Sequence, residues 1–187
     1  RKLKNSTKSI ESINGLSFIK NEKFVQNKKQ KIISNLDILS PYDYDIFEDQ
    51  VFNRPYNGDV IRAVDYEMSR GCIYSCNYCV ETIIQKYYDF ESFSQQTGAI
   101  KNFKSYLRNK SAKKIFEELS YLSKIKNVKL IRCQDTNFLT NDRSVLMELA
   151  NLIKKSDLDI KIYIETRPEG INEKSIELLK ELKCGSD

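Results

Sequence analysis

The chain has 187 residues, of which 30% are charged and 40% are hydrophobic, and its formal net charge is +5. This composition is typical of a soluble globular protein, and no apolar run approaches the roughly 20 residues that span a bilayer. We therefore exclude a disordered chain and a membrane partner, and we expect a cytoplasmic protein with one core plus a smaller appendage.

Residues 1–58 are expected to form an N-terminal lead-in. Lysines are spread over 1–31 without the dense basic patch and interleaved aromatic residues of a nucleic-acid interface, so we expect no nucleic-acid site. Alternating residues over 16–25, with Asn21 and Glu22 as the turn, predict a small hairpin. Residues 36–44 are expected to be irregular. Turn-forming residues around Asn57 predict a domain boundary there, which leaves 59–187 as the second domain.

From residue 59 onward, strand and helix patterns alternate. Strands are predicted over 60–68, 128–133 and 160–165. Helices are predicted over 80–88 and after three polar caps: Ser111, then Asn141 or Asp142, then Asn172. Residues 89–109 between the first two helices are expected to form an aromatic-rich, irregular insert.

This order predicts an α/β fold with parallel strands joined by right-handed crossovers. Because three strand–helix units do not close a barrel, we interpret 59–187 as the first half of a larger (β/α) barrel rather than a small open sheet. The third strand would then leave an open sheet edge, through which self-association is expected. On this interpretation the chain is an incomplete piece of an enzyme.

Three of the five cysteines, Cys72, Cys76 and Cys79, fall in one loop after the first strand. Their Cys-x-x-x-Cys-x-x-Cys spacing would let three thiolates hold three irons of a cubane and leave the fourth iron open. Such clustering indicates a metal site in a reducing compartment rather than a disulfide framework. A zinc site with Cys133 or Cys184 as fourth ligand is the alternative; otherwise these two are small buried hydrophobic residues.

The loop from Ser69 to Cys79, with the aromatic Tyr78 before the third cysteine, resembles the radical S-adenosylmethionine (SAM) superfamily. The resemblance implies a 4Fe-4S cluster on Cys72, Cys76 and Cys79, with SAM bound to the open iron. It also implies an electron donor such as flavodoxin or ferredoxin. Reductive cleavage of SAM would then start radical chemistry on a small-molecule or other substrate, with the cofactors carrying the chemistry and the protein positioning them.

The same resemblance implies four SAM contacts. Tyr78 would pack near the adenine, Asp135 would meet the amino group, Glu165 would bind the ribose hydroxyls and Arg167 would pair with the carboxylate. Asp135 stands where the family usually has a glycine-rich acidic segment. The plainer alternatives are a helix cap or loop residue for Asp135 and a surface ion pair for Glu165 and Arg167. No catalytic side chain is predicted.

Residues 14–18, 35–41 and 108–111 are similar to segments of cobalamin-linked radical SAM proteins, where a linker joins a cobalamin-binding domain to the barrel. This finer resemblance implies a cobalamin held by a domain outside this chain. A methylthiotransferase acting on transfer RNA or protein is a second candidate, and it would be expected to carry three further cysteines upstream. The candidate from another functional class is a binding module whose fold is stabilised by a structural zinc site.

Overall fold

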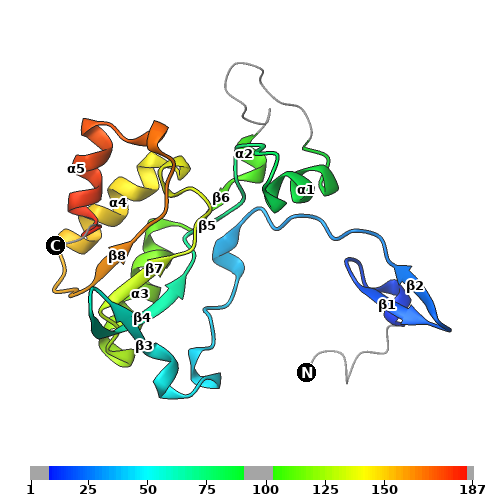
Figure 1. The fold of residues 1–187 in the computed structure, drawn as a ribbon, viewed down its shortest axis with the longest axis horizontal. Helices are drawn as coiled ribbons and strands as arrows, with labels where there is room; N and C mark the ends of the chain where they lie inside the picture. The colour runs from blue at the N-terminus through cyan, green and yellow to red at the C-terminus, as the bar shows by residue number, and fades with distance from the viewer. Residues whose placement is uncertain (1–8, 91–102, 185–187) are drawn as a thin grey trace. The chain divides into compact units, whose positions relative to one another are not determined.

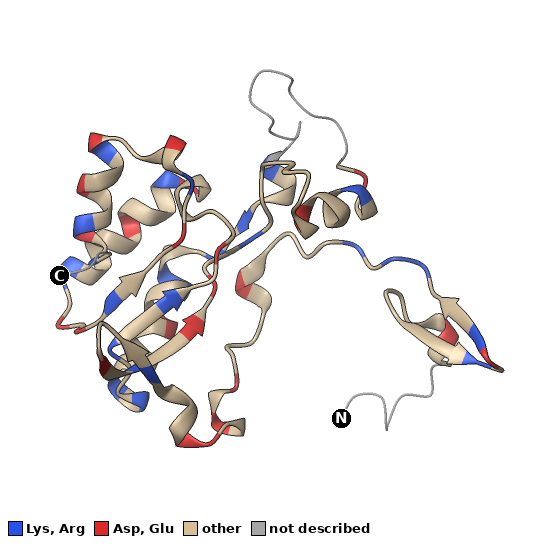
Figure 2. Cartoon of the chain, viewed as in Figure 1, with Lys and Arg blue, Asp and Glu red and all other residues tan. Residues whose placement is uncertain are grey.

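The computed structural model describes residues 9–90 and 103–184, and the chain divides into two compact units, 1–33 and 34–187 (Figure 1). The first unit contains the 3₁₀ helix η1 (Ile10–Ser12) and an antiparallel hairpin of β1 (Ser17–Lys20) and β2 (Lys23–Gln26). Asn21 and Glu22 have φ values of 49° and 62°, as a two-residue hairpin turn requires. The predicted hairpin is therefore confirmed. Lysines follow β2 along the chain (Figure 2).

The second unit is organised on a four-stranded sheet with the order β3-β4-β7-β8. The predicted parallel pairings are confirmed, because β4 pairs in parallel with β7 and β7 with β8. The antiparallel neighbour β3 was not predicted. The strands are β3 (Asn53–Tyr56), β4 (Asp59–Tyr66), β7 (Leu130–Cys133) and β8 (Lys161–Tyr163).

The turn between β3 and β4 consists of Asn57 and Gly58, with φ values of 50° and 85°. It makes a tight hairpin, so residues on both sides of position 58 share one sheet. The domain boundary expected near Asn57 therefore stays a prediction.

At the other edge of the sheet, Ile162 donates its N–H to the carbonyl of Lys183 at 3.1 Å and forms a parallel bridge with Cys184. Self-association through this edge likewise stays a prediction.

The three long helices begin at caps that the sequence predicted. The side chains of Ser111, Asp142 and Asn172 each accept a hydrogen bond from a backbone N–H in the first turn, and Asn172 forms a reciprocal capping box with Ser175. Asn127, with φ of 53°, ends the first of them. The helices are α3 (Ala112–Lys126), α4 (Arg143–Lys154) and α5 (Glu173–Glu181).

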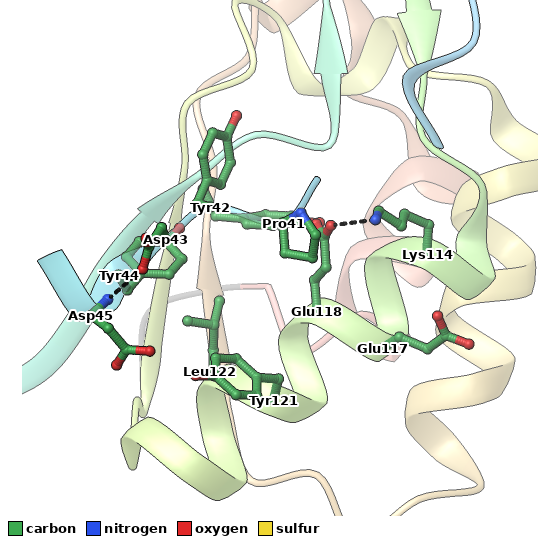
Figure 3. A pocket seen from close by; sticks show the side chains of 11 residues that line it. Pro41, Tyr42, Asp43, Tyr44, Asp45, Lys114, Glu117, Glu118, Tyr121 and Leu122 are labelled. Atoms are coloured by element: carbon green, nitrogen blue, oxygen red, sulfur yellow. Dashed lines mark hydrogen bonds and ion pairs between the residues drawn. The ribbon is translucent and has the colours of Figure 1, made fainter. Parts of the chain in front are cut away.

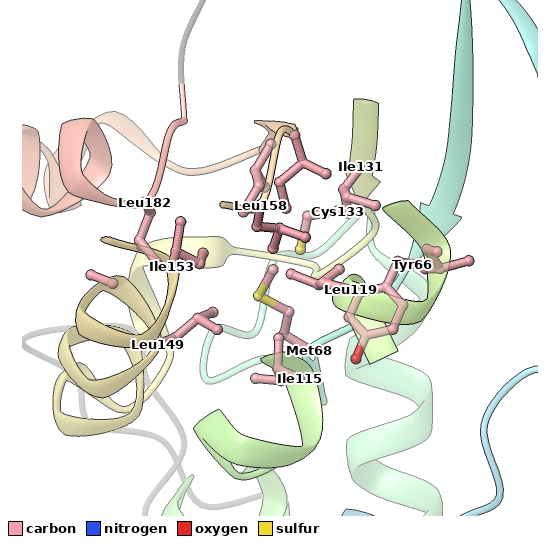
Figure 4. Packing of buried hydrophobic residues seen from close by; sticks show 14 of the residues in the cluster. Tyr66, Met68, Ile115, Leu119, Ile131, Cys133, Leu149, Ile153, Leu158 and Leu182 are labelled. Atoms are coloured by element: carbon pink, nitrogen blue, oxygen red, sulfur yellow. The ribbon is translucent and has the colours of Figure 1, made fainter. Parts of the chain in front are cut away.

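These helices bury one face of the sheet. Side chains of α3 and α4 gather around Met68 and Cys133 (Figure 4), and Ile115, Leu119 and Leu149 are each 0% exposed. Burying such a side chain contributes about 1.5–3 kcal/mol. Alternate strand residues point to the opposite face, where Asp65 and Tyr163 are exposed and Arg132 is half-buried. The sheet is thus covered by helices on one side.

The remaining elements are short. β5 (Ser69–Arg70) pairs antiparallel with β6 (Arg108–Asn109), beside α1 (Val80–Tyr87) and α2 (Phe103–Tyr106). Part of the expected irregular insert, 91–102, lies outside the described residues, and 103–109 is more regular than expected. The 3₁₀ helices of this unit are η2 (Leu36–Ile38), η3 (Tyr44–Ile46), η4 (Asp49–Phe52), η5 (Phe138–Thr140) and η6 (Pro168–Gly170). Within the described ranges, no helix is long and apolar enough to cross a membrane.

Residues 34–52, which we call the strap, are tied to α3 and β4 by polar contacts. Ser111 donates its backbone N–H to Asp37 at 2.8 Å, and Lys114 Nζ donates to the carbonyl of Leu39 at 3.1 Å. Farther along, Asp45 pairs with Lys126 and Asp49 pairs with Arg62. Two acidic side chains of the strap, Asp45 and Asp49, therefore pair with basic side chains of α3 and β4. Figure 2 shows where acidic and basic residues lie along these segments.

A cavity of about 340 Å³ lies between the strap and α3 (Figure 3). Its wall holds Glu118, whose Oε2 accepts from Lys110 Nζ at 2.8 Å and from the Tyr66 hydroxyl at 2.5 Å, while Oε1 lies 3.1 Å from Lys114 Nζ. Lys110 and Glu118 are both almost fully buried. Burial alone would raise the pKa of Glu118, but the hydrogen bonds from Lys110 and Tyr66 lower it below its usual value.

We expect Glu118→Gln to destabilise the fold by about 3–5 kcal/mol at neutral pH, because it leaves the Lys110 ammonium buried without its counter-charge. Urea unfolding followed by circular dichroism measures this loss. Because the folded-state pKa of Glu118 is lowered, its stabilisation is present above the usual glutamate pKa and is lost as the pH falls through the folded-state value. The difference between wild type and variant should therefore shrink in acid.

The control is Glu117→Gln on the same helix. Glu117 is exposed and its nitrogen partner, Lys113, lies 3.9 Å away, so we expect a change of at most about 1 kcal/mol. Equal losses for the two variants would contradict the role assigned to Glu118.

Candidate functional site

The cysteine loop, residues 71–79, runs from the end of β5 to the start of α1. Gly71 has φ of +101°, and a Cβ at this position would lie 2.5 Å from the carbonyl oxygen of Tyr106, so the position requires glycine. Farther along, the N–H of Cys79 donates to the carbonyl of Cys76 at 3.0 Å, and the Thr82 hydroxyl donates to the same oxygen at 2.8 Å. The second and third cysteines are thereby held in one turn.

Gln85 of α1 fixes the first half of the loop. Its Nε2 donates to the carbonyls of Cys72 at 2.9 Å and Tyr74 at 2.8 Å, and its side chain is 0% exposed. The sequence analysis did not identify Gln85 as a site residue. Its only signal in the sequence is a polar residue on the buried side of the helix that follows the cysteines.

The three loop cysteines border a cavity of about 730 Å³. The facing wall comes from Thr136 and Asn137 after β7 and from residues 167–169 after β8, so the cavity lies at the carboxyl ends of two parallel strands. Open parallel sheets bind ligands at such ends. Residues from the loop that also line it are Tyr74, Asn77 and Tyr78.

The loop thiols are free, and their surroundings differ. Cys72 is buried, and burial raises its pKa. Cys76 Sγ accepts a hydrogen bond from Arg167 Nη1 at 3.4 Å. Within the described ranges, no group of three or more Cys, Asp or Glu side chains is arranged so that it could hold a metal ion. The loop presents three free thiols at one cavity.

Two of the four predicted SAM contacts border this cavity. The side chain of Tyr78 is 92% exposed. The guanidinium of Arg167 stacks over the ring of Tyr74, with 4.2 Å between its Cζ and the ring centroid, and pairs with Glu169. That pairing lowers the pKa of Glu169 to about 2. The expected SAM roles of Tyr78 and Arg167 stay predictions.

Asp135 and Glu165 are not among the residues that line the cavity. Asp135 is 3% exposed, and its carboxylate accepts from the backbone N–H of Met68 at 2.8 Å and of Ser69 at 3.2 Å. It also accepts from the Ser69 hydroxyl and from Asn141 Nδ2, both at 2.7 Å. Asp135 thus anchors the chain just before the cysteine loop. Glu165 is exposed, and its direct contact with SAM, like that of Asp135, stays a prediction.

Asn137 is a second site residue that the sequence analysis did not identify. It is 6% exposed, and its Oδ1 accepts from the Thr166 hydroxyl at 2.7 Å and from the N–H of Arg167 at 3.2 Å. This side chain joins the ends of β7 and β8. The signal that could have found it is the polar run that directly follows the buried strand ending at Cys133.

The two remaining cysteines lie away from this cavity. Cys133 belongs to the core and is 2% exposed, and burial together with the neighbouring Asp135 raises its pKa. Cys184 is partly buried against the same core, and burial raises its pKa to about 12. Neither lines the cavity of the loop cysteines, which does not favour a zinc site with one of them as fourth ligand.

No protein-family model matches the chain. The chain is 25% identical over 177 residues to an uncharacterized methyltransferase of Pyrococcus horikoshii. It is 23% identical over 171 residues to the anaerobic magnesium-protoporphyrin IX monomethyl ester cyclase of Synechocystis. These matches cover 95% and 87% of this chain but 34% and 28% of the relatives, so the chain spans about a third of their length.

Solved structures with a similar fold are cobalamin-binding radical SAM enzymes. The methyltransferase TsrM from Kitasatospora setae, with cobalamin and a 4Fe-4S cluster bound, matches 94% of this chain and 32% of its own, with a TM-score of 0.59 and 15% identity. The cobalamin-dependent enzyme OxsB, with aqua-cobalamin and SAM bound, matches 92% of this chain and 22% of its own, with a TM-score of 0.57 and 17% identity. The chain therefore shares the fold of these enzymes.

The anchoring role of Asp135 predicts that Asp135→Asn destabilises the protein by about 1–3 kcal/mol, because the new amide meets the Asn141 amide and leaves buried donors unpaired. Chemical denaturation of the protein without cofactors measures this. The matched control is Asp142→Asn, for which we expect almost no change, because asparagine caps a helix as well as aspartate does. A stability unchanged by Asp135→Asn would show that the four hydrogen bonds do not hold the loop.

Proposed function

We propose that this chain is part of an iron–sulfur enzyme that reductively cleaves SAM to start radical chemistry on a substrate. The observation that carries the proposal is that Cys72, Cys76 and Cys79 border one cavity at the carboxyl ends of β7 and β8. Three thiols with this spacing are the donor set of a 4Fe-4S cluster that keeps one iron open.

The residues around the cavity fit such a cluster. All three thiols are free and come from one wall, and the opposite wall is polar. Among the described residues that line the cavity there is no fourth cysteine, so one iron would stay open for SAM. Bound there, the cluster would supply the electron that cleaves SAM to methionine and a 5′-deoxyadenosyl radical.

The protein would contribute binding and orientation. Gln85 holds the carbonyls of the loop, and Asp135 holds the backbone from which the loop departs. The exposed ring of Tyr78 offers a flat surface on which the adenine of SAM would stack. Thr136 and Asn137 provide polar groups on the facing wall. These roles match those expected of a protein whose cofactors carry the reaction itself.

We further propose that the complete protein is cobalamin-linked and that this chain forms the first part of a (β/α) barrel. The cobalamin-binding enzymes TsrM and OxsB support the first point at the level of the fold. The face of the sheet away from the helices, on which Asp65 and Tyr163 are exposed, supports the second, because parallel sheets normally bury both faces. Since the chain has no histidine, a histidine ligand to cobalt would have to come from elsewhere.

The reducing partner proposed for this enzyme is a low-potential electron donor such as flavodoxin or ferredoxin, and the substrate is a small molecule or another compound. Methylthio transfer remains a second reaction that the same core would allow. No described residue favours it over the first proposal.

The cluster assignment is tested by anaerobic reconstitution with iron and sulfide. The protein should then hold about four irons and an equal amount of sulfide per chain, with broad visible absorption that bleaches on reduction by dithionite. Replacing Cys72, Cys76 or Cys79 by alanine should abolish the absorption. The matched controls, Cys133→Ala and Cys184→Ala, should retain it, because neither thiol borders the cavity.

If the purified protein contains zinc and no sulfide, the alternative of a binding module stabilised by a zinc site would be favoured instead. Retention of the cluster in Cys76→Ala together with its loss in Cys133→Ala would contradict the ligand assignment.

A further inference from the structure

We propose that Arg167 is a positioning residue that raises the reduction potential of the cluster by donating a hydrogen bond to the sulfur of Cys76. This inference rests on the proposed function. The observation behind it is the contact between Arg167 Nη1 and Cys76 Sγ at 3.4 Å, which joins the end of the third parallel strand to the cysteine loop across 91 residues of sequence.

The guanidinium is held in this place from several directions. Asn137 Oδ1 accepts from the backbone N–H of Arg167 at 3.2 Å, and Asn137 itself is buried. Glu169 accepts from Arg167 Nε at 3.3 Å and pairs with Nη2. The ring of Tyr74 lies under the guanidinium, with Cζ 4.2 Å from its centroid. The cation is therefore preorganised next to a cluster ligand.

The same contacts compete with the expected SAM carboxylate. All three guanidinium nitrogens already have partners, since Nε and Nη2 face Glu169 and Nη1 faces Cys76. The Nε–Nη2 edge, which binds a carboxylate in a bidentate manner, is occupied by Glu169, so a SAM carboxylate would have to displace Glu169 there or use the remaining N–H groups of Nη1 and Nη2. The contact that the structure contains for Nη1 is the one to Cys76 Sγ, and the inference concerns this contact.

A donor aimed at a cluster sulfur favours the reduced state. In the relevant step, a low-potential donor passes one electron to the oxidised cluster, and no covalent bond or leaving group is involved. The reduced cluster carries one more negative charge, so a positive N–H group next to a ligand sulfur stabilises it more than the oxidised form. Losing this contact should reduce the equilibrium constant for reduction roughly tenfold, which for one electron equals about 59 mV toward negative potential.

The test is a redox titration of the anaerobically reconstituted protein, with dithionite as reductant and paramagnetic resonance of the reduced cluster as readout. We expect Arg167→Gln to shift the midpoint potential negatively and to leave the iron and sulfide content unchanged, and SAM affinity is measured alongside. Arg167→Lys keeps the positive charge but loses the planar set of guanidinium N–H donors. The midpoint potential of its cluster should fall between those of wild type and Arg167→Gln. The matched control Arg143→Gln, at an exposed arginine on α4, should leave the potential unchanged.

An unchanged potential in Arg167→Gln, with iron and sulfide retained, would overturn the inference. If SAM binding weakened at the same time, Arg167 would instead belong to the SAM carboxylate. Absence of iron and sulfide from the reconstituted wild type would overturn the proposed function itself, so the two failures are distinguishable.

Discussion

The buried carboxylate of Asp135 is the constraint on which the cysteine loop depends. It gathers donors from the Met68–Ser69 backbone, the Ser69 hydroxyl and the Asn141 amide, and Asn141 in turn accepts from Asn109 Nδ2 at 2.8 Å. These contacts connect the end of β7, the β5–β6 pair and the start of α4. Leaving a buried polar group unpaired costs more free energy than a typical hydrogen bond contributes. Moving one of these segments alone would leave buried groups unpaired, so the segments hold one another in place. The loop therefore starts from a fixed point.

Local chemistry made much of the fold predictable. Ser111 and Asn172 indicated where helices begin, because short polar side chains accept hydrogen bonds from the free N–H groups of a first turn. Asn21 indicated a tight turn, because asparagine tolerates a positive φ. The β3–β4 hairpin was missed although Asn57 and Gly58 are a strong signal for one, because the turn-forming residues around Asn57 were interpreted as a domain boundary. The β5–β6 pair was missed for another reason: it joins residues some forty positions apart, and two-residue strands leave no periodicity.

The site was predictable to a smaller extent. The spacing of three cysteines indicated the cluster loop, and the rule that parallel strands end at one edge brought Arg167 to the same cavity. What the sequence could not give was the partner of each polar side chain. Asp135 turned inward to backbone N–H groups, and Asn137 bridges two strand ends, because a buried oxygen is satisfied by whichever donors the fold brings near. Such choices depend on contacts across about 30 to 70 residues of sequence, as these bonds illustrate.

The close approach of Gly71 to the Tyr106 carbonyl has a mechanical consequence. Contacts between side chains absorb small displacements by changing rotamer, whereas this contact joins backbone to backbone. The carbonyl is itself held by Arg108 Nε at 2.8 Å, and the Tyr106 hydroxyl is held by Glu81 of α1 at 2.8 Å. A displacement of Tyr106 at the end of α2 would therefore move Gly71, the residue before the first loop cysteine, by a similar amount. Part of the stiffness of the loop therefore comes from α2, a helix of which no described side chain lines the cavity.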